Sequence, residues 1–148
     1  MEQEQAWREL DRLYKEAEAI FHLLAKRSGL SDSAFLILYA LVDLGEGCLQ
    51  RDICTQYSLS PQTVNSSLKK LAAQGYLRLE PGRGRGLHLF FTGSGRQLVQ
   101  RAILPAMELE RRAFGGLEPW EQASLVQLEQ KYLRLLQAQL EKLPPTSN

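Results

Sequence analysis

The sequence predicts a mainly α-helical protein with one small β-hairpin, in which a central lobe lies between two terminal helices. Three observations predict this fold class. Apolar residues recur at helical spacing through most of the 148 residues, two short runs alternate between apolar and polar residues, and basic residues gather in the middle of the chain.

The charge distribution separates the middle of the chain from its flanks. Residues 50–101 hold eight basic and two acidic residues, a local charge of +6, whereas the whole chain carries +1. Residues 1–49 hold five basic and nine acidic residues, and residues 102–148 hold five and six. A basic middle between acidic flanks is the distribution expected of a protein that binds a polyanion.

The composition excludes several classes of protein. At 148 residues with 44% hydrophobic content, we expect one compact domain or one domain with extensions. The two cysteines form neither a metal-binding CxxC pair nor a disulfide framework, which favours a reducing cytoplasm. The acidic start MEQEQAWREL is unlike a signal peptide, and the longest apolar run, residues 34–42, is far shorter than the roughly 20 residues of a membrane span. We expect no membrane association, no metal and no cofactor.

The first helix is expected from Glu2 to Lys26, where no glycine or proline interrupts the pattern, and Ser28-Gly29 closes it. Its apolar residues step 3-4-3-4-3, and Leu13 and Ile20 widen the face. A helix this apolar needs a partner surface. The stepping residues are Trp7, Leu10, Tyr14, Ala17, Phe21 and Leu24.

Two shorter helices follow. Ser31 is a good N-cap for the second, which ends at Gly45 or Gly47, and a third covers about Arg51 to Tyr57. Cys48 and Leu49, between them, are long enough for a minimal strand. The residues expected to face inward are Phe35, Leu38, Leu41 and Val42 from the second helix and Ile53 and Cys54 from the third.

The fourth helix has the clearest boundaries. Ser60 caps it, Pro61 takes the first helical position, where a missing N–H costs nothing, and Gly75 stops it. The turn before it is Ser58-Leu59-Ser60. The core-facing residues are Val64, Leu68, Leu71 and Ala72.

A hairpin and two further helices complete the chain. Residues 77–80 and 87–91 alternate with period two and are joined by Pro81-Gly82-Arg83-Gly84-Arg85-Gly86. Thr92 caps a long fifth helix with a kink expected at Pro105, Gly115-Gly116 breaks it, and Pro119 opens a last helix. Since both terminal helices are amphipathic, a homodimer that buries their apolar faces is the expected state.

The third and fourth helices with their tight turn form a helix–turn–helix, whose second helix can enter the major groove of DNA. Small polar side chains dominate the outer side of that helix, and Gln and Asn can bond adenine with two hydrogen bonds. The alternative is the solvated side of an ordinary surface helix. The candidate DNA-binding residues are Ser60, Gln62, Thr63, Asn65, Ser66, Lys69 and Lys70, the two lysines being expected at the phosphate backbone.

The hairpin tip places Arg83 and Arg85 on a glycine-rich backbone. Such a tip can lie across a phosphate ridge and insert arginine into the minor groove. The alternative is a hairpin tip that charge merely keeps soluble. A nucleotide-binding glycine loop would require a helix after the loop, and here a strand follows.

Three segments together resemble the MarR family of bacterial winged-helix transcriptional regulators. They are LSDSAFLILYAL, LQRDICTQYSLSPQTVNSSLKKLAAQGYL and RGLHLFFTGSGR, and FTGSGR is similar to the family's LT-x-x-G. The family's wing carries Asp-x-Arg; Arg85 takes the arginine position, whereas Arg83 replaces the aspartate, whose bracing role has no evident holder. The resemblance implies a winged helix–turn–helix lobe over residues 31–101, with dimerisation helices from residues 1–30 and 102–148.

The resemblance also implies a homodimer that binds a pseudo-palindromic operator in double-stranded DNA and usually represses transcription. Members often bind small aromatic effectors in a cleft between the dimer helices and the lobe. Tyr14, His22, Phe35 and Tyr39 could line such a cleft here, although each is more readily explained as a core or dimer residue.

Other functions are less well supported. A winged helix that docks a protein partner is the main alternative, which the +6 charge and the polar fourth helix disfavour. No Ser-His-Asp, paired-carboxylate or Cys-His arrangement indicates an enzyme. Cys48 and Cys54 are better explained as packing residues than as redox sensors.

Overall fold

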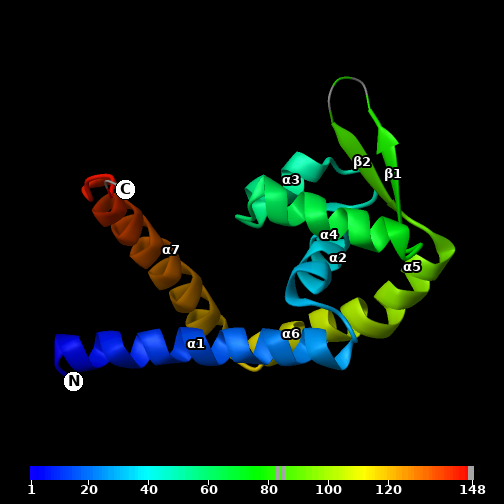
Figure 1. The fold of residues 1–148 in the computed structure, drawn as a ribbon. Helices are drawn as coiled ribbons and strands as arrows, with labels where there is room; N and C mark the ends of the chain where they lie inside the picture. The colour runs from blue at the N-terminus through cyan, green and yellow to red at the C-terminus, as the bar shows by residue number, and fades with distance from the viewer. Residues whose placement is uncertain (83, 85, 147–148) are drawn as a thin grey trace. The chain divides into compact units, whose positions relative to one another are not determined.

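The computed structural model describes residues 1–82, 84 and 86–146 of the chain. It contains seven α-helices, a π-helical turn and a two-stranded hairpin in this described part (Figure 1). The chain forms two compact units, one ending at Met107 and the other beginning at Glu108. In order, the elements are α1 (Gln3–Arg27), α2 (Asp32–Leu44), α3 (Gln50–Gln56), α4 (Pro61–Ala73), β1 (Leu77–Pro81), β2 (Leu87–Phe91), α5 (Gly93–Leu98), η1 (Val99–Ile103), α6 (Leu104–Gly115) and α7 (Pro119–Glu141).

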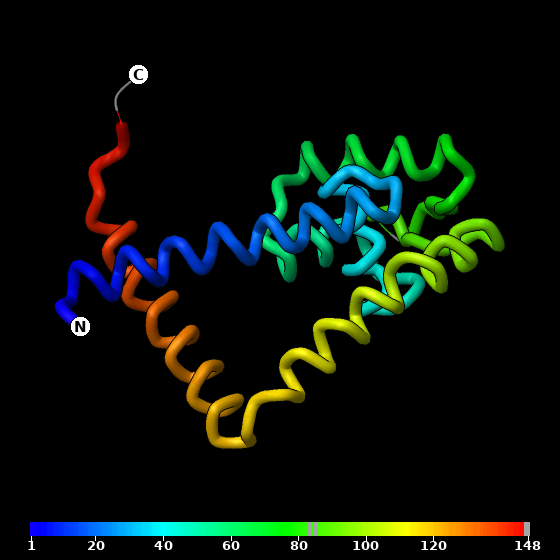
Figure 2. The backbone as a smooth tube through the Cα atoms, turned by 90° about the horizontal axis from the view of Figure 1, so that it is seen from below, coloured from blue at the N-terminus to red at the C-terminus, as the bar shows by residue number. Residues whose placement is uncertain are grey.

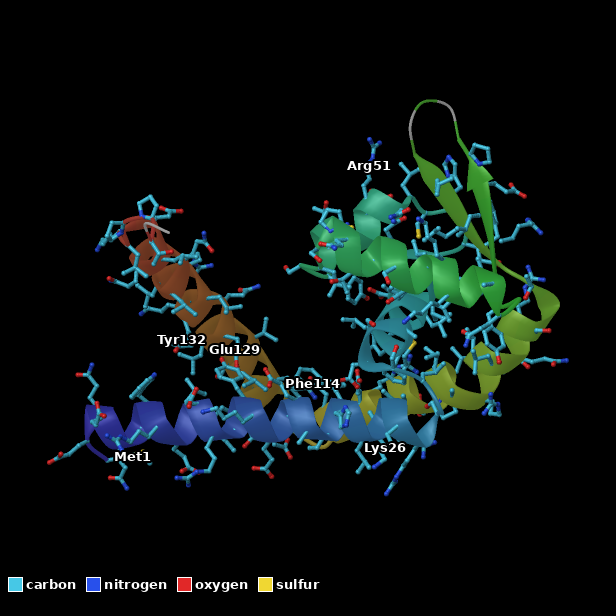
Figure 3. The ribbon with its side chains drawn as sticks, in the orientation of Figure 1. Met1, Lys26, Arg51, Phe114, Glu129 and Tyr132 are labelled. Carbon is cyan, nitrogen blue, oxygen red and sulfur yellow. The ribbon has the colours of Figure 1, made fainter. Side chains whose placement is uncertain are left out.

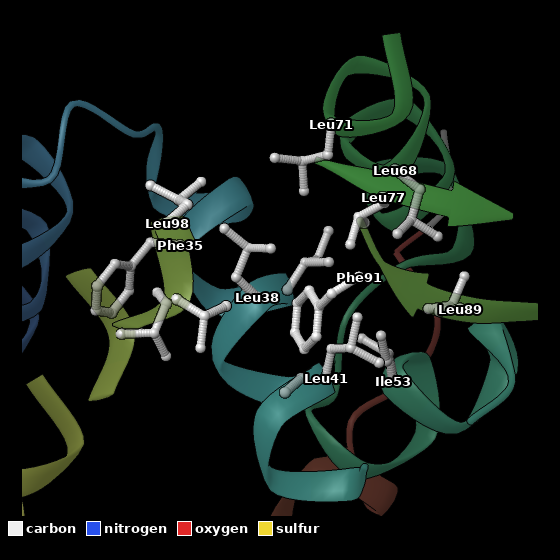
Figure 4. Packing of buried hydrophobic residues seen from close by; sticks show 14 of the residues in the cluster. Phe35, Leu38, Leu41, Ile53, Leu68, Leu71, Leu77, Leu89, Phe91 and Leu98 are labelled. Carbon is white, nitrogen blue, oxygen red and sulfur yellow. The ribbon is translucent and has the colours of Figure 1, made fainter. Parts of the chain in front are cut away.

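The core of the first unit is built around α2, which buries five of its residues. Leu38 and Leu41 pack with Ile53 of α3, Leu68 of α4 and Leu89 of β2 in one hydrophobic cluster (Figure 4). The predicted inward positions are confirmed for most of the set, while Val42, Cys54 and Ala72 are only half-buried. Because residues of both belong to this cluster, α4 and the hairpin are held in a fixed position relative to α2.

The helix boundaries follow the capping residues that the sequence predicts. Ser31 accepts a hydrogen bond from the backbone N–H of Ala34, Ser60 from that of Thr63, and Thr92 from that of Gly95. Since each cap satisfies an amide that the helix leaves free, the helices begin within one residue of the predicted positions. The first and third helices are likewise shifted by one residue from the expected ranges.

The hairpin is antiparallel, with Leu77 opposite Phe91 and Leu79 opposite Leu89. The other edge of β2 meets the segment before α3. The N–H of Gly47 donates to the carbonyl of Leu89 (2.8 Å), the N–H of Leu89 donates to the carbonyl of Cys48 (3.0 Å), and Leu49 forms a bridge with His88. The minimal strand predicted at Cys48 and Leu49 is therefore found as an isolated bridge.

The long helix expected after Thr92 is divided into α5, η1 and α6. Pro105 lacks an N–H, and its ring would collide with the carbonyl four residues earlier in a regular helix. The π-helical turn of η1 ends at Ile103, two residues before Pro105, and the N–H of Leu104 bonds to the carbonyl of Val99. The wider turn accommodates the proline without ending the helical path.

The long helices α1 and α7 each carry large apolar side chains that their own unit leaves exposed; Figure 2 traces both as continuous helical paths. In α7, no described residue is buried. Leu128 and Leu135, seven residues apart on α7, are 65% and 56% exposed. Of the described helices, none has the length and apolarity needed to cross a membrane.

Candidate nucleic-acid interface

The helix α4 separates its core side from its polar side. Val64, Leu68 and Leu71 are buried. Ser67 is also buried, at 8% exposed, and its Oγ donates to Oγ of Ser33 (3.0 Å). The remaining polar side chains face away from the core. All the predicted DNA-binding residues of this helix and its cap are exposed: Ser60, Gln62, Thr63, Asn65, Ser66, Lys69 and Lys70.

The start of α4 is held by its own side chains. Ser60 Oγ accepts from the N–H of Thr63 (3.1 Å) and donates to Oγ1 of Thr63 (2.7 Å). Both hydroxyls are therefore partly engaged in the cap, although each oxygen keeps capacity for a further bond. Gln62 and Asn65 carry the amides that are best suited to read a base edge.

The hairpin that follows α4 projects from the lobe (Figure 1). The two arginines predicted to contact DNA from its tip, Arg83 and Arg85, lie outside the described residues. One pair below the loop end of the hairpin, Nδ1 of His88 lies 2.7 Å from the carbonyl oxygen of Gly47. Since a carbonyl only accepts, Nδ1 carries the hydrogen and ties β2 to the segment before α3.

Glu46 ties the end of the hairpin to the helix that follows it. Its Oε1 accepts from the N–H of Phe91 (2.8 Å), and its Oε2 lies 3.3 Å from Nη2 of Arg96 on α5. The sequence gives no indication of this contact, because Glu46 and Phe91 are 45 residues apart. A carboxylate from outside the hairpin thus fixes the wing strand at its base.

The basic residues of the middle segment divide into two groups. The first group is paired: Nε of Arg78 lies 2.7 Å from Oε1 of Glu80, and Arg96 pairs with Glu46. The Cζ atom of Arg78 also lies 5.2 Å from the ring centre of Phe90. Within the described part of the chain, no carboxylate lies within 4.0 Å of the other four cations, which leaves their charge available to a polyanion. These four are Arg51, Lys69, Lys70 and Arg101.

The four residues predicted to line an effector cleft have different surroundings. Phe35 is 4% exposed and belongs to the core, and its ring centre lies 6.4 Å from that of half-buried Tyr39. His22 is exposed, with Nδ1 2.8 Å from Oδ1 of Asp32, and Tyr14 is half-buried. The effector cleft stays a prediction.

The cysteines are both free and half-buried. Desolvation by burial, with a smaller contribution from the charge of Asp52, raises the pKa of the Cys48 thiol. No group of three or more His, Cys, Asp or Glu side chains among the described residues is arranged to hold a metal ion.

Comparison with known proteins agrees with this geometry. The model of the MarR family matches residues 28–86. A MarR family regulator from Neisseria meningitidis, NMB1585, superposes with a TM-score of 0.72 at 23% identity, covering 90% of this chain and 97% of its own. BpsR from Bordetella bronchiseptica superposes with a TM-score of 0.67 at 29% identity, covering 86% of this chain and 98% of its own. MarR from Staphylococcus aureus superposes with a TM-score of 0.69 at 13% identity, covering 95% of this chain and 93% of its own. The search of curated proteins gives no significant match.

The helix–turn–helix, the paired strands after it and the capped helix at Thr92 define a winged helix–turn–helix protein. Residues 28–86 match the MarR family, and solved MarR family transcriptional regulators share the fold of most of the chain. The predicted resemblance to the MarR family is thus confirmed over residues 28–86, and the predicted fold class is confirmed.

Proposed function

We propose that this protein is a sequence-specific DNA-binding transcriptional regulator that acts as a homodimer on a pseudo-palindromic operator. The observation that carries the proposal is the outer side of α4. Its exposed side chains are small and polar or basic, without a single carboxylate, whereas its inner side is locked into the core.

In this proposal α4 enters the major groove, which is about 12 Å wide. Gln62 and Asn65 read base edges, and Lys69 and Lys70 contact the phosphate backbone. Arg83 and Arg85, at the wing tip, are assigned to the minor groove and the adjacent phosphates on the basis of the sequence alone. The ion pairs of Arg78 and Arg96 make these two arginines weaker candidates.

The homodimer is supported by the apolar side chains of the terminal helices. Trp7, Ile20 and Phe21 of α1 are about half exposed, and the leucines of α7 are exposed along its length. Exposed apolar side chains in such number are typical of an interface. A two-fold dimer of winged helices would bind half-sites whose centres lie about 34 Å apart, one turn of the duplex.

Repression relieved by a small aromatic effector is the mode of action we propose. DNA binding by BpsR is regulated by 6-hydroxynicotinic acid, and S. aureus MarR is solved in complex with salicylate and kanamycin. Tyr14, His22 and Tyr39 would supply the aromatic rings that contact such an effector, whereas Phe35 belongs to the core.

Selection of bound duplexes from a random pool tests the proposal. We expect an enriched motif with two related half-sites and an affinity that falls steeply with salt, because each neutralised phosphate releases counterions. Recovery of no motif, together with an affinity that is flat with salt, would reject DNA recognition and favour a protein-docking role for the winged helix.

A further inference from the structure

One acidic side chain, that of Glu46, lies against the wing of the basic lobe. Its carboxylate contacts the end of β2 and α5, which both belong to the segment of charge +6. A negative charge at this place weakens the attraction between the lobe and a polyanion. The contacts that Glu46 makes therefore have to be weighed against its charge.

A β-turn presents Glu46 to the hairpin. The N–H of Cys48 donates to the carbonyl of Gly45 (3.3 Å), which closes the turn over four residues. Gly47 has a φ of +88°, and glycine is the residue that adopts this left-handed region without strain. The sequence Gly-Glu-Gly thus keeps Glu46 at a defined corner of the turn.

The same turn holds β2 at two levels. At the first level, the backbone N–H and carbonyl of Leu89 bond to Cys48 and Gly47. Residues two apart in a strand direct their N–H groups to the same edge, so the N–H of Phe91 also faces the turn. There the acceptor is Oε1 of Glu46 (2.8 Å). Bonds at one level leave a strand free to pivot, whereas bonds at two levels fix its direction.

The carboxylate of Glu46 is itself anchored from α5. Nη2 of Arg96 lies 3.3 Å from its Oε2 and 3.4 Å from its Oε1. This pair holds the side chain in the conformation that reaches Phe91, and it joins β2 to the helix that follows. Because the strands of the hairpin project from the lobe (Figure 3), contacts near their base set the direction of the wing.

We propose that Glu46 is a positioning residue for DNA binding, which fixes the direction of the wing and is needed in spite of its negative charge. The inference rests on the proposed function, in which the wing contacts DNA. A wing that is free to pivot has to be ordered when DNA binds, and this cost lowers the affinity.

Three variants separate the position of the carboxylate from its charge. Glu46→Ala removes the bond to Phe91, Glu46→Asp keeps the charge on a side chain one methylene shorter, and Glu46→Gln keeps an acceptor oxygen without the charge. We expect the first two to bind the duplex recovered by selection about two- to eightfold more weakly at 0.1 M salt, eightfold being the loss of one phosphate contact. Glu46→Gln should bind at least as tightly as wild type.

Glu80→Ala is the matched control. It removes the same charge from β1 of the wing, where Glu80 pairs with Arg78 of its own strand. Charge alone predicts tighter binding for both alanine variants, so opposite signs for Glu46→Ala and Glu80→Ala identify the positioning role.

Two further measurements exclude a general loss of stability. In an Arg85→Ala background the loss caused by Glu46→Ala should shrink, because it acts through the wing, whereas a loss of stability would add. Hydrogen exchange of the Phe91 amide, followed by NMR without DNA, should be faster in Glu46→Ala and Glu46→Asp and remain slow in Glu46→Gln.

The outcomes separate the two proposals. If wild-type protein binds no duplex at any salt, the proposed function fails. If it binds, but Glu46→Asp binds as tightly as wild type, Glu46→Ala binds more tightly, or the double variant is additive, Glu46 does not position the wing. Unchanged exchange of the Phe91 amide in Glu46→Ala would overturn the inference as well. If Glu46→Ala fails to fold, the comparison of Glu46→Asp with Glu46→Gln decides.

Discussion

At the scale of single residues, different side chains of α4 are proposed to contact the bases and the backbone of DNA. The amides of Gln62 and Asn65 have the donor and acceptor pair that matches adenine, while Lys69 and Lys70 are point charges on flexible stems. Because all four are exposed, substituting them tests DNA binding without disturbing the core.

Asn65→Ala should relax base preference at one position of each half-site. A bidentate amide contact contributes roughly 1–3 kcal/mol of discrimination, so affinity for the best operator should fall while affinity for random duplex stays constant. Lys69→Ala is the matched comparison and should weaken binding to all sequences alike. Competition titrations with operators substituted at each position measure the affinity of each variant for the best operator and for the other sequences. Uniform loss with Asn65→Ala would assign it to the backbone.

The thiol of Cys48 should be alkylated more slowly in the folded protein than in the unfolded chain. Burial raises the pKa of its thiol, with Asp52 adding to the rise, so less thiolate is present at a given pH. We expect the pH–rate profile of Cys48 alkylation in the folded protein to lie at higher pH than that measured in urea. Coincident profiles would show that the thiol is not shielded.

At the scale of elements, the starts of the helices could be predicted because a helix cap involves only residues that are close in sequence. Ser31, Ser60 and Thr92 each bond an amide three residues on, so sequence spacing is sufficient to find them. The π-helical turn η1 could not be predicted in the same way. Pro105 indicates a disturbance, but whether the chain kinks or widens depends on packing of the preceding turn.

The motif FTGSGR has a steric explanation at its second glycine. A Cβ at Gly95 would lie 2.0 Å from the carbonyl oxygen of Tyr76, while a Cβ at Gly93 would meet nothing within 4 Å. The backbone of α5 therefore approaches the start of β1 too closely for any side chain at Gly95.

Gly95→Ala should destabilise the protein by about 1–3 kcal/mol or more, the usual cost of overpacking. Gly93→Ala, in the same helix, should be neutral or stabilise by up to ~1 kcal/mol, because alanine favours the helix. Urea unfolding followed by circular dichroism measures both. Equal stability of the two variants would contradict the steric explanation.

At the scale of the whole molecule, the proposed dimer unites two winged helices on one operator. Leu135→Lys should weaken the dimer, since a charge would be buried in the interface that α7 is proposed to form. Gln137→Lys introduces the same charge at a polar exposed position of α7 and is the control. Sedimentation equilibrium reports the dissociation constants. An unchanged dimer in the leucine variant would exclude this part of α7 from the interface.

The candidate interface was only partly predictable at this scale. The residues of α4 follow from helical spacing on one element. Arg51 is exposed and was not among the predicted DNA-binding residues, because its place beside α4 and β2 depends on how three elements meet. The ion pairs of Arg78 and Arg96 likewise become visible only in the folded structure. They reduce the positive charge that this segment can present to DNA.

The segment before α3 also bears on how the protein behaves at high concentration. An open strand edge can pair with another chain and begin aggregation. One edge of β2 is paired with β1. Its other edge is hydrogen-bonded to Gly47 and Cys48, and the N–H of Phe91, at the end of β2, donates to Glu46. The outer strand β1 carries Arg78, Glu80 and Pro81, residue types that discourage strand addition. The wing can thus extend toward DNA without acting as a template for self-association between hairpins.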